Sequence, residues 1–289
     1  MRAAYAMTDG RQFGHAAVLE MRAHAVASRR HGHAIFLSHS LGRLATMKTW
    51  ALYSLKGGVG KTAAAVNLAY EAAASGKHVL LWDLDPQGAA SWYMGIDESP
   101  EISAKRVVAG KEPLGRYVRP SAFERLDVLP GDRGYRDWDA HIHASKQPRK
   151  VLESLIEPFS ETYSLLILDC PPGIGALATA ILRAADRVLV PVVPTPLSLR
   201  ALDEVNAHVE AKKVGKTNIT PFFSMADRRR RMHKDLIAAP PAAMKKAPKT
   251  FIDYATHVEK MGEHRAPVAV FAPRSRAASQ YRALYKTLA

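Results

Sequence analysis

From residue 47 to the C-terminus, the chain alternates short apolar runs with longer helical stretches. Short, uninterrupted apolar runs are typical of strands that are buried on both faces of a parallel sheet. The predicted strands cover residues 49–55, 78–82, 126–129, 165–168, 187–193, 219–223 and 268–271. The predicted helices cover residues 62–75, 151–156, 177–184, 199–213 and 277–288. This alternation predicts a single-domain α/β fold, in which a mostly parallel sheet carries helices on both faces.

The first 46 residues follow a different pattern. They contain six arginines and five histidines, only Asp9 and Glu20 as acids, and no alternation of strands with helices. Arginine-rich, acid-poor segments are also typical of transit peptides, and Arg29-Arg30 before a short apolar run weakly resembles an export signal. We interpret residues 1–46 as a disordered N-terminal extension and residues 47–289, beginning at Met47, as the folded domain.

A glycine-rich segment, SLKGGVGKTAA at residues 54–64, lies between the first predicted strand and the first predicted helix. Glycines at this junction let backbone N–H groups approach phosphate oxygens, and the helix N-terminus adds partial positive charge. Lys61 is expected to reach the β- and γ-phosphates, and the Thr62 hydroxyl is expected to bind Mg²⁺. The predicted nucleotide-binding residues of this loop are Lys56, Gly57, Gly58, Val59, Gly60, Lys61, Thr62 and Ala63. The spacing departs from the usual phosphate loop, because Leu55 replaces the first glycine and Lys56 adds a second cation.

Carboxylates follow two of the predicted strands. Asp83 and Asp85 end the apolar run LLWDLD, and Asp169 ends LLILD. Strand ends of a parallel sheet meet at one edge, where ligands bind in this architecture. Asp169 is predicted to support Mg²⁺ through water, and of Asp83 and Asp85 one is predicted to support the metal and the other to orient the attacking water. A single aspartate at a strand end is more often a turn or helix cap, but three beside a phosphate loop favour a nucleotide site.

Composition adds two constraints. The single cysteine, Cys170, excludes an internal disulfide framework and is typical of a reducing, cytoplasmic environment. The formal net charge of +14 favours a polyanionic partner, either nucleic acid or an anionic membrane.

Three segments in this order, KGGVGKT at 56–62, DLDPQG at 83–88 and DCPPG at 169–173, resemble the ParA/MinD family of deviant Walker A ATPases. The likeness runs from Met47 to the C-terminus and is greatest to stand-alone ParA-like proteins. It implies a P-loop NTPase-type fold, ATP and Mg²⁺ as cofactors, and weak, partner-stimulated ATP hydrolysis.

The resemblance also assigns roles to individual residues. It implies that Lys56 crosses the interface of a homodimer and contacts the phosphates bound by the partner, so that ATP lies between two subunits. It implies that Asp85 positions the hydrolytic water. Two positions depart from the family pattern. Ala63 replaces a second threonine, and residues 252–255 (IDYA) replace I-P-x-N, where Asp253 is expected to accept a hydrogen bond from the adenine amine.

Two branches of the family differ in what the dimer binds, which is a membrane in one branch and DNA in the other. A MinD-like membrane helix would need a free apolar face, whereas the stripe of Tyr281, Leu284, Tyr285 and Leu288 is more typical of core packing. Non-specific DNA binding needs exposed cations. The candidate DNA-binding residues are Arg228, Arg230, Arg231, Lys245, Lys246, Arg274 and Arg276.

These observations favour a cytoplasmic, nucleoid-associated ATPase that partitions or positions a plasmid, a chromosome or a protein assembly through a ParB-like or cargo adaptor protein. Three alternatives remain. One is a MinD-like membrane-associated ATPase. Another is a nucleotide-binding regulatory module with little turnover. The third, an enzyme resembling nitrogenase reductase, would need cluster-ligating cysteines, for which Cys170 alone is a poor basis.

Overall fold

The computed structural model describes residues 47–97, 100–212, 214 and 218–289. The predicted extension at residues 1–46 lies outside the described residues, as does position 213, the last residue of one predicted helix.

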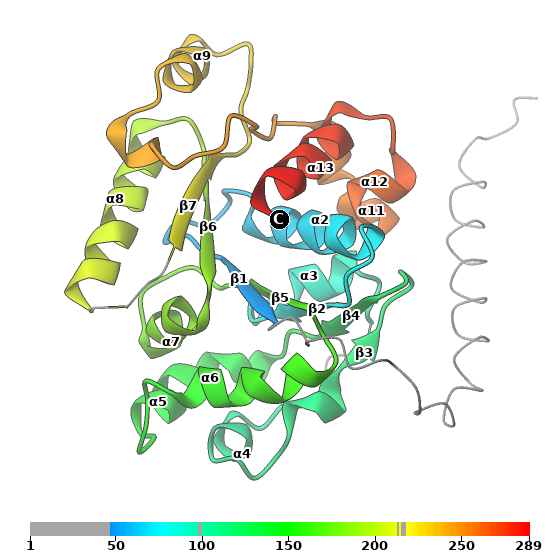
Figure 1. Cartoon of the computed structure of the whole chain (residues 1–289), viewed down its shortest axis with the longest axis vertical. Coiled ribbons are helices and arrows are strands. Elements are labelled where there is room, and N and C mark those ends of the chain that lie inside the picture. Colours follow the sequence, from blue (N-terminus) through cyan, green and yellow to red (C-terminus); the bar gives the residue numbers. More distant parts are fainter. Residues whose placement is uncertain (1–46, 98–99, 213, 215–217) are drawn as a thin grey trace, which may run out of the picture. The chain divides into compact units, whose positions relative to one another are not determined.

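A seven-stranded sheet forms the centre of the described domain (Figure 1). Its strand order is β3-β4-β2-β5-β1-β6-β7, and every neighbouring pair is parallel except β3 and β4. The strands are β1 (Lys48–Leu52), β2 (Val79–Asp83), β3 (Arg119–Pro120), β4 (Leu126–Leu129), β5 (Leu165–Asp169), β6 (Arg187–Val192) and β7 (Asn218–Phe223). The predicted α/β fold with a mostly parallel sheet is confirmed.

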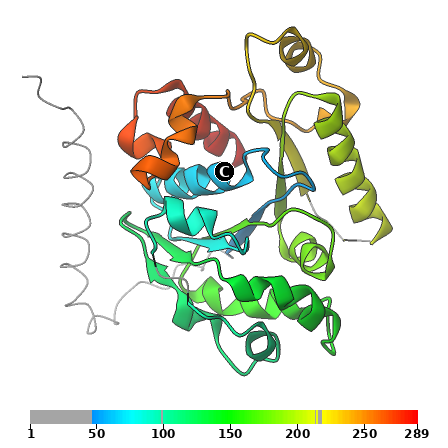
Figure 2. The ribbon, with the colours of Figure 1, turned by 180° about the vertical axis from the view of Figure 1, so that it is seen from behind.

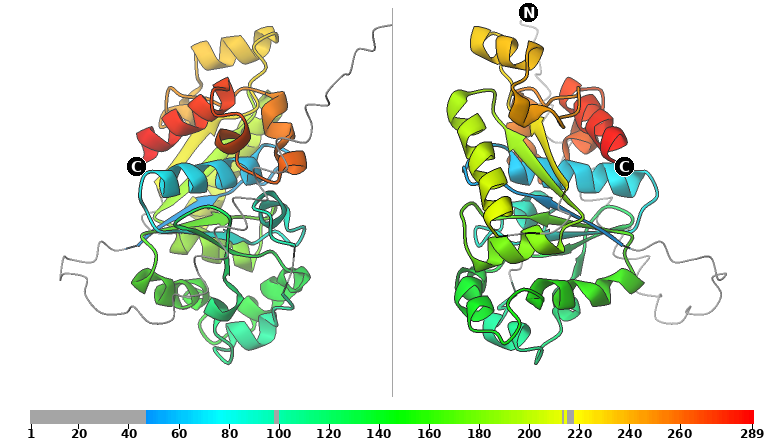
Figure 3. Two further views of the ribbon diagram at one scale, coloured as in Figure 1. Left: turned by 90° about the vertical axis from the view of Figure 1, so that its right-hand side faces the viewer. Right: turned by 60° about the vertical axis from the view of Figure 1, so that its left-hand side comes forward.

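Helices cover both faces of this sheet, as the views from behind and from the side show (Figures 2 and 3). One face carries α2 (Lys61–Ala74), α3 (Ala89–Tyr93), α11 (Met261–His264), α12 (Val268–Phe271) and α13 (Arg276–Leu288). The other carries α4 (Ala104–Val108), α5 (Trp138–His143), α6 (Val151–Ile156), α7 (Ala176–Ala184) and α8 (Pro196–Ala211). The remaining helices are α9 (Arg231–Ala238), α10 (Thr256–Glu259) and the 3-10 turns Leu114–Tyr117, Arg133–Asp137, Glu157–Glu161 and Ala242–Met244.

Alternation along the strands divides the apolar core into two layers. On β5, Leu165 and Ile167 pack with the α2 and α13 layer, whereas Leu166 and Leu168 pack with the α7 and α8 layer. All four side chains are completely buried. Successive residues of a strand point to opposite faces, so a strand that is covered on both faces must be apolar throughout.

The C-terminal helix α13 packs against α2. Its apolar stripe of Tyr281, Leu284, Tyr285 and Leu288 is buried, and Arg282 pairs with the buried Glu71 of α2 at 3.2 Å. This stripe is therefore core packing. None of the helices in the described part of the chain is both long enough and apolar enough to span a bilayer.

The strand prediction at residues 268–271 is wrong, because these residues form helix α12. Pro267 precedes the segment in an extended conformation, which is compatible with a helix start, and the Val268 N–H donates to the Asn67 Oδ1 of α2 at 2.9 Å. The run is apolar because it packs on α2 and α13. Its apolar character therefore reflects burial, which does not distinguish a short helix from a strand.

Candidate nucleotide-binding site

The glycine-rich loop joins the end of β1 to the start of α2, as predicted. Gly58 and Gly60 adopt φ angles of +69° and +88°, values that side chains other than glycine rarely adopt. A Cβ at Gly60 would also lie 2.8 Å from the Ser224 Oγ, at the end of β7. Two observations favour glycine at position 60: the positive φ of its backbone and the close approach of Ser224, which follows β7.

Lys61 is the first residue of α2 and is buried, with 8% of its side chain exposed. Its Nζ donates a hydrogen bond to the Lys56 carbonyl oxygen at 3.3 Å, so the ammonium lies under the loop that precedes it. Burial lowers the Lys61 pKa, and the negative charge of Asp169 opposes that shift. A buried ammonium that is close to a carboxylate and held by a single loop carbonyl is well placed to bind phosphate oxygens.

Asp169 ends β5 and is completely buried. Neither of its carboxylate oxygens has a hydrogen-bond partner of ordinary geometry among the described residues. Burial and the neighbouring Asp83 raise the Asp169 pKa well above its usual range, whereas the Thr62 hydroxyl and Lys61 oppose the shift. A buried carboxylate without donors is costly unless a cation binds to it.

Asp83 ends β2 in direct register with Asp169 and is equally buried, but its oxygens are satisfied. Oδ2 accepts from the Ser91 N–H at 2.8 Å and the Ser91 hydroxyl at 2.7 Å, and Oδ1 accepts from the Asp85 N–H at 3.2 Å. The Ser91 Oγ in turn accepts from the Gly131 N–H at 2.9 Å. Burial nevertheless raises the Asp83 pKa to about 6. Asp83 thus organises the loop that carries Asp85.

Asp85 is half-buried at the tip of that loop. Its Oδ1 accepts from the Gln87 N–H at 2.9 Å, and its backbone oxygen accepts from the Gly88 N–H at 2.9 Å. Its Oδ2 accepts no hydrogen bond from the described residues. The predicted carboxylates therefore lie at one edge of the sheet but in three environments: Asp169 is buried without donors, Asp83 is buried with donors, and Asp85 is accessible to water.

Two contacts connect these loops. Tyr53, which follows β1 and is buried, donates its hydroxyl to the Gly173 carbonyl oxygen at 2.8 Å. The Leu84 N–H donates to the Asp169 carbonyl oxygen at 2.9 Å. The segments that follow β1, β2 and β5 are thereby held together around the phosphate loop. The sequence pattern does not indicate Tyr53, Ser91 or Ser224, because a hydroxyl in these segments has no spacing that marks it.

Asp253 has a different environment from the one expected of an adenine acceptor. Its carboxylate pairs with Arg228 at 3.0 Å and with Arg276 at 2.8 Å, and Arg228 also lies over the Phe251 ring. A backbone bridge from Ala226 to Asp253 places this segment beside the end of β7, which contacts the phosphate loop at Gly60.

The seven candidate DNA-binding cations divide into two groups. Arg228 and Arg276 share Asp253, and Arg231 lies 3.7 Å from Asp235. The other four are exposed and make no ion pair within the described part of the chain: Arg230, Lys245, Lys246 and Arg274. Arg229 pairs with Asp227 at 3.0 Å, and this contact lowers the Asp227 pKa to about 2.

Comparison with known proteins agrees with this geometry. A family model described as an AAA domain matches residues 47–220. The chain is 29% identical to the sporulation initiation inhibitor protein Soj of Bacillus subtilis over 248 residues, 84% of this chain and 98% of that protein. It is 30% identical to the chromosome partitioning protein ParA of Myxococcus xanthus over 161 residues, 55% of this chain and 57% of that protein.

Solved structures show the same fold. An ATP complex of a McdA variant from Cyanothece superposes with a TM-score of 0.73 at 19% identity, covering 84% of this chain and 97% of that one. The septum site-determining protein MinD from Pyrococcus horikoshii, with Mg-ADP, gives a TM-score of 0.66 at 22% identity, covering 84% and 96%. Together with the family match and the phosphate-loop geometry, these similarities show that the chain belongs to the ParA/MinD family of P-loop ATPases.

Proposed function

We propose that this chain is an ATP-dependent, dimerising ATPase that binds DNA non-specifically and partitions or positions a cargo. The observation that carries the proposal is the Asp169 carboxylate, which is buried beside the Lys61 ammonium and the Thr62 hydroxyl and accepts no hydrogen bond of ordinary geometry from the described residues. Such a site is incomplete without a cation. The relative named as the chromosome partitioning protein ParA supports the partitioning role.

The residues present fit Mg²⁺. A magnesium ion in a nucleotide site usually takes one or two protein oxygens and completes its shell with phosphate and water. Thr62 and Asp169 would supply those protein oxygens, and the metal would neutralise charge on the β- and γ-phosphates. Asp83 already accepts three hydrogen bonds, which supports a role for it in holding the Asp85 loop.

The chain's own groups account for the remaining requirements of hydrolysis. Loop N–H groups and Lys61 bind and orient the phosphates. Asp85, whose Oδ2 accepts no hydrogen bond from the described residues, would accept a hydrogen bond from the attacking water and orient it. The hydrogen bond from Tyr53 to Gly173 connects the start of the phosphate loop to the segment that follows Asp169. A conformational change in the loop on nucleotide binding would therefore be transmitted to this segment.

Dimerisation is supported by the surface around the loop. Lys56 is only partly buried, and Ile174 and Leu197 expose 58% and 62% of their side chains just after β5 and β6. These apolar side chains lie at the same edge of the sheet as the nucleotide loop, and a second subunit would cover them. We propose that Lys56 then contacts the partner's nucleotide.

Arg230, Lys245, Lys246 and Arg274 are the best-supported DNA contacts, because they are exposed and make no ion pair with the described acidic side chains. The buried face of α13 gives the membrane alternative no comparable support. For adenine recognition, Asp253 would have to accept from the base amine while it is already paired with two arginines.

Light scattering of the full chain with Mg-ATP and with Mg-ADP, together with steady-state hydrolysis with and without duplex DNA, tests the proposal. We expect the mass to double with Mg-ATP only, accompanied by measurable turnover. An unchanged mass and no turnover would favour the regulatory-module alternative.

A further inference from the structure

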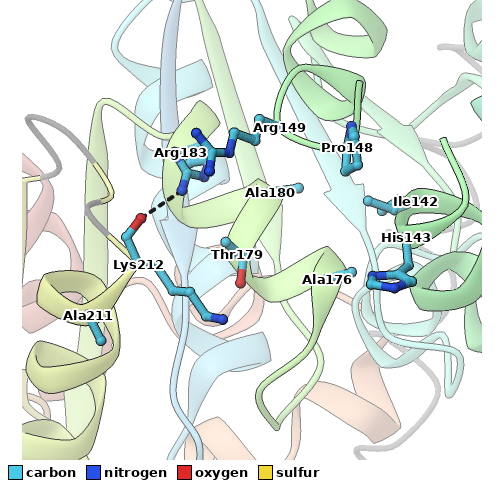
Figure 4. Close-up of a pocket in the computed structure, with 10 residues that line it drawn as sticks. All are labelled: Ile142, His143, Pro148, Arg149, Ala176, Thr179, Ala180, Arg183, Ala211 and Lys212. Carbon is cyan, nitrogen blue, oxygen red and sulfur yellow. Dashed lines mark hydrogen bonds between the residues drawn. The ribbon is translucent and has the colours of Figure 1, made fainter. Parts of the chain in front are cut away.

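A pocket with a volume of about 480 Å³ is lined by residues of α5, α7, the end of α8 and the segment that joins α5 to α6 (Figure 4). Its floor is one face of α7, where Ala176, Thr179, Ala180 and Arg183 recur at helical spacing. Its walls are the C-terminal end of α8 and the segment that joins α5 to α6. The volume is within the range of about 300–1,000 Å³ that is typical of small-molecule sites.

The charged side chains that line this pocket are all cationic. Arg149, Arg183 and Lys212 line it, and no carboxylate does. Arg149 and the Lys212 ammonium make no ion pair within the part of the chain that the structure describes. The nearby Asp139 accepts from the Leu177 N–H at 2.7 Å, and it does not line the pocket. Positive side chains that gather in a concave site without counter-charges attract an anion.

One hydrogen bond holds the Arg183 guanidinium in place, but another of its N–H donors has no acceptor among the described residues. Its Nη2 donates to the Lys212 carbonyl oxygen at 2.7 Å, which connects α7 to the end of α8 (Figure 4). Its Nε is buried and has no hydrogen-bond partner among the described residues. A fixed guanidinium with an unused buried donor is preorganised for an acceptor that the protein itself does not provide.

We propose that this pocket binds the phosphate group of a small phosphorylated molecule. Two guanidinium groups and an ammonium carry more positive charge than a ligand with a single carboxylate would offset. The planar N–H donors of arginine also match the arrangement of phosphate oxygens. Ala176 and Ala180 leave room for the rest of the ligand. The site is separate from the phosphate loop, because none of its lining residues belongs to that loop.

The test is a phosphorus NMR titration of inorganic phosphate into the full chain with saturating Mg-ADP, so that the nucleotide loop is filled. We expect binding that Arg149→Gln and Arg183→Gln each weaken by about tenfold or more. The matched control is Arg200→Gln, because Arg200 is an exposed arginine of α8 that pairs with Glu204 instead. Thermal unfolding of each variant shows whether the fold is retained, and Arg149→Gln removes no hydrogen bond or ion pair among the described residues.

Citrate and duplex DNA serve as competitors. Phosphate binding that depends on Arg149 and Arg183 and persists in the presence of both competitors would support the proposal, whatever the hydrolysis assay shows. Stronger binding of citrate would overturn the phosphate assignment in favour of a carboxylate ligand. Displacement by DNA, with weaker DNA binding of Arg149→Gln, would make the pocket part of a nucleic-acid surface. Equal phosphate binding by all variants would contradict the proposal outright.

Discussion

Asp83 and Asp169 are register partners on the neighbouring strands β2 and β5, yet among the described residues only Asp83 accepts hydrogen bonds of ordinary geometry. Two buried carboxylates in adjacent positions repel each other, and burial raises the pKa of both. The nucleotide-free protein is therefore destabilised at the site where a cation is needed. This relationship connects the stability of the fold to its proposed ligand.

The first prediction concerns Asp169→Asn. The Asp169 pKa is raised in the folded protein, so the native state binds the proton more tightly than the unfolded state and stability falls as pH rises through that pKa. The neutral amide removes this cost. We expect nucleotide-free Asp169→Asn protein to gain about 1 kcal/mol or more in free energy of unfolding near neutral pH.

Urea denaturation near pH 7 and near pH 5 measures this effect. The gain should shrink at the lower pH, because the raised Asp169 pKa means that a fall in pH favours the neutral form of the wild-type carboxyl group. Asp235→Asn, at an exposed position, should show neither effect. An Asp169→Asn protein that is less stable than wild type at both pH values would show that the carboxylate has a partner that the account lacks.

Lys61→Ala is expected to abolish nucleotide binding, because it removes the buried ammonium that lies beneath the loop. Calorimetric titration with Mg-ATP is the appropriate measurement. Unchanged affinity would overturn the assignment of the phosphate loop.

Lys56→Ala provides the matched comparison. Its side chain is partly exposed and its proposed target lies on the other subunit, so one subunit should still bind nucleotide with little change. Dimerisation with Mg-ATP and hydrolysis should both be lost. Light scattering that finds a normal ATP-dependent dimer in this variant would refute the role across the interface.

Gly60→Ala should destabilise the protein even without nucleotide. The substitution places a side chain at a φ of +88° and a Cβ 2.8 Å from the Ser224 Oγ. Positive φ alone costs on the order of 1–2 kcal/mol for a residue with a side chain. Gly57→Ala is the control, because no heavy atom lies within 4 Å of its Cβ and its φ is not positive. Thermal unfolding should separate the two variants, and equal melting temperatures would contradict the loop geometry.

The sequence predicted the parts of the fold in which local pattern and burial agree. The strands that carry Leu52, Asp83 and Asp169 form where expected, and their carboxyl ends meet beside the glycine-rich loop. The two-residue strand β3 has no apolar run to mark it, because it lies at the sheet edge with partly exposed residues. Strand order is also absent from local pattern, because it depends on which strands pair across long crossovers.

The candidate site also depends on long-range contacts that local sequence pattern does not indicate. The three aspartates were found as a group, but their different environments depend on Ser91, which reaches Asp83 only after the loop folds back. The two arginines that pair with Asp253 lie 25 and 23 residues away along the chain, so no local spacing indicates them.

The central claim is that ATP closes a DNA-binding dimer and that hydrolysis opens it. In Asp85→Ala the phosphate loop and Asp169 keep their side chains, but the carboxylate that we propose orients the water is removed. Loss of one such positioning group typically lowers the rate on the order of 10²–10³-fold. The ATP-bound dimer should therefore accumulate.

The measurement that tests this claim most directly is DNA binding by Asp85→Ala protein, with and without Mg-ATP, across a salt series. We expect long-lived, ATP-dependent binding that weakens steeply with salt, because phosphate contacts release counterions. In the same background, substitution of Arg230 should lower the salt slope more than substitution of Arg231, which is already near Asp235. Asp85→Ala protein that binds DNA no better with ATP than without it would contradict the account and favour the membrane alternative.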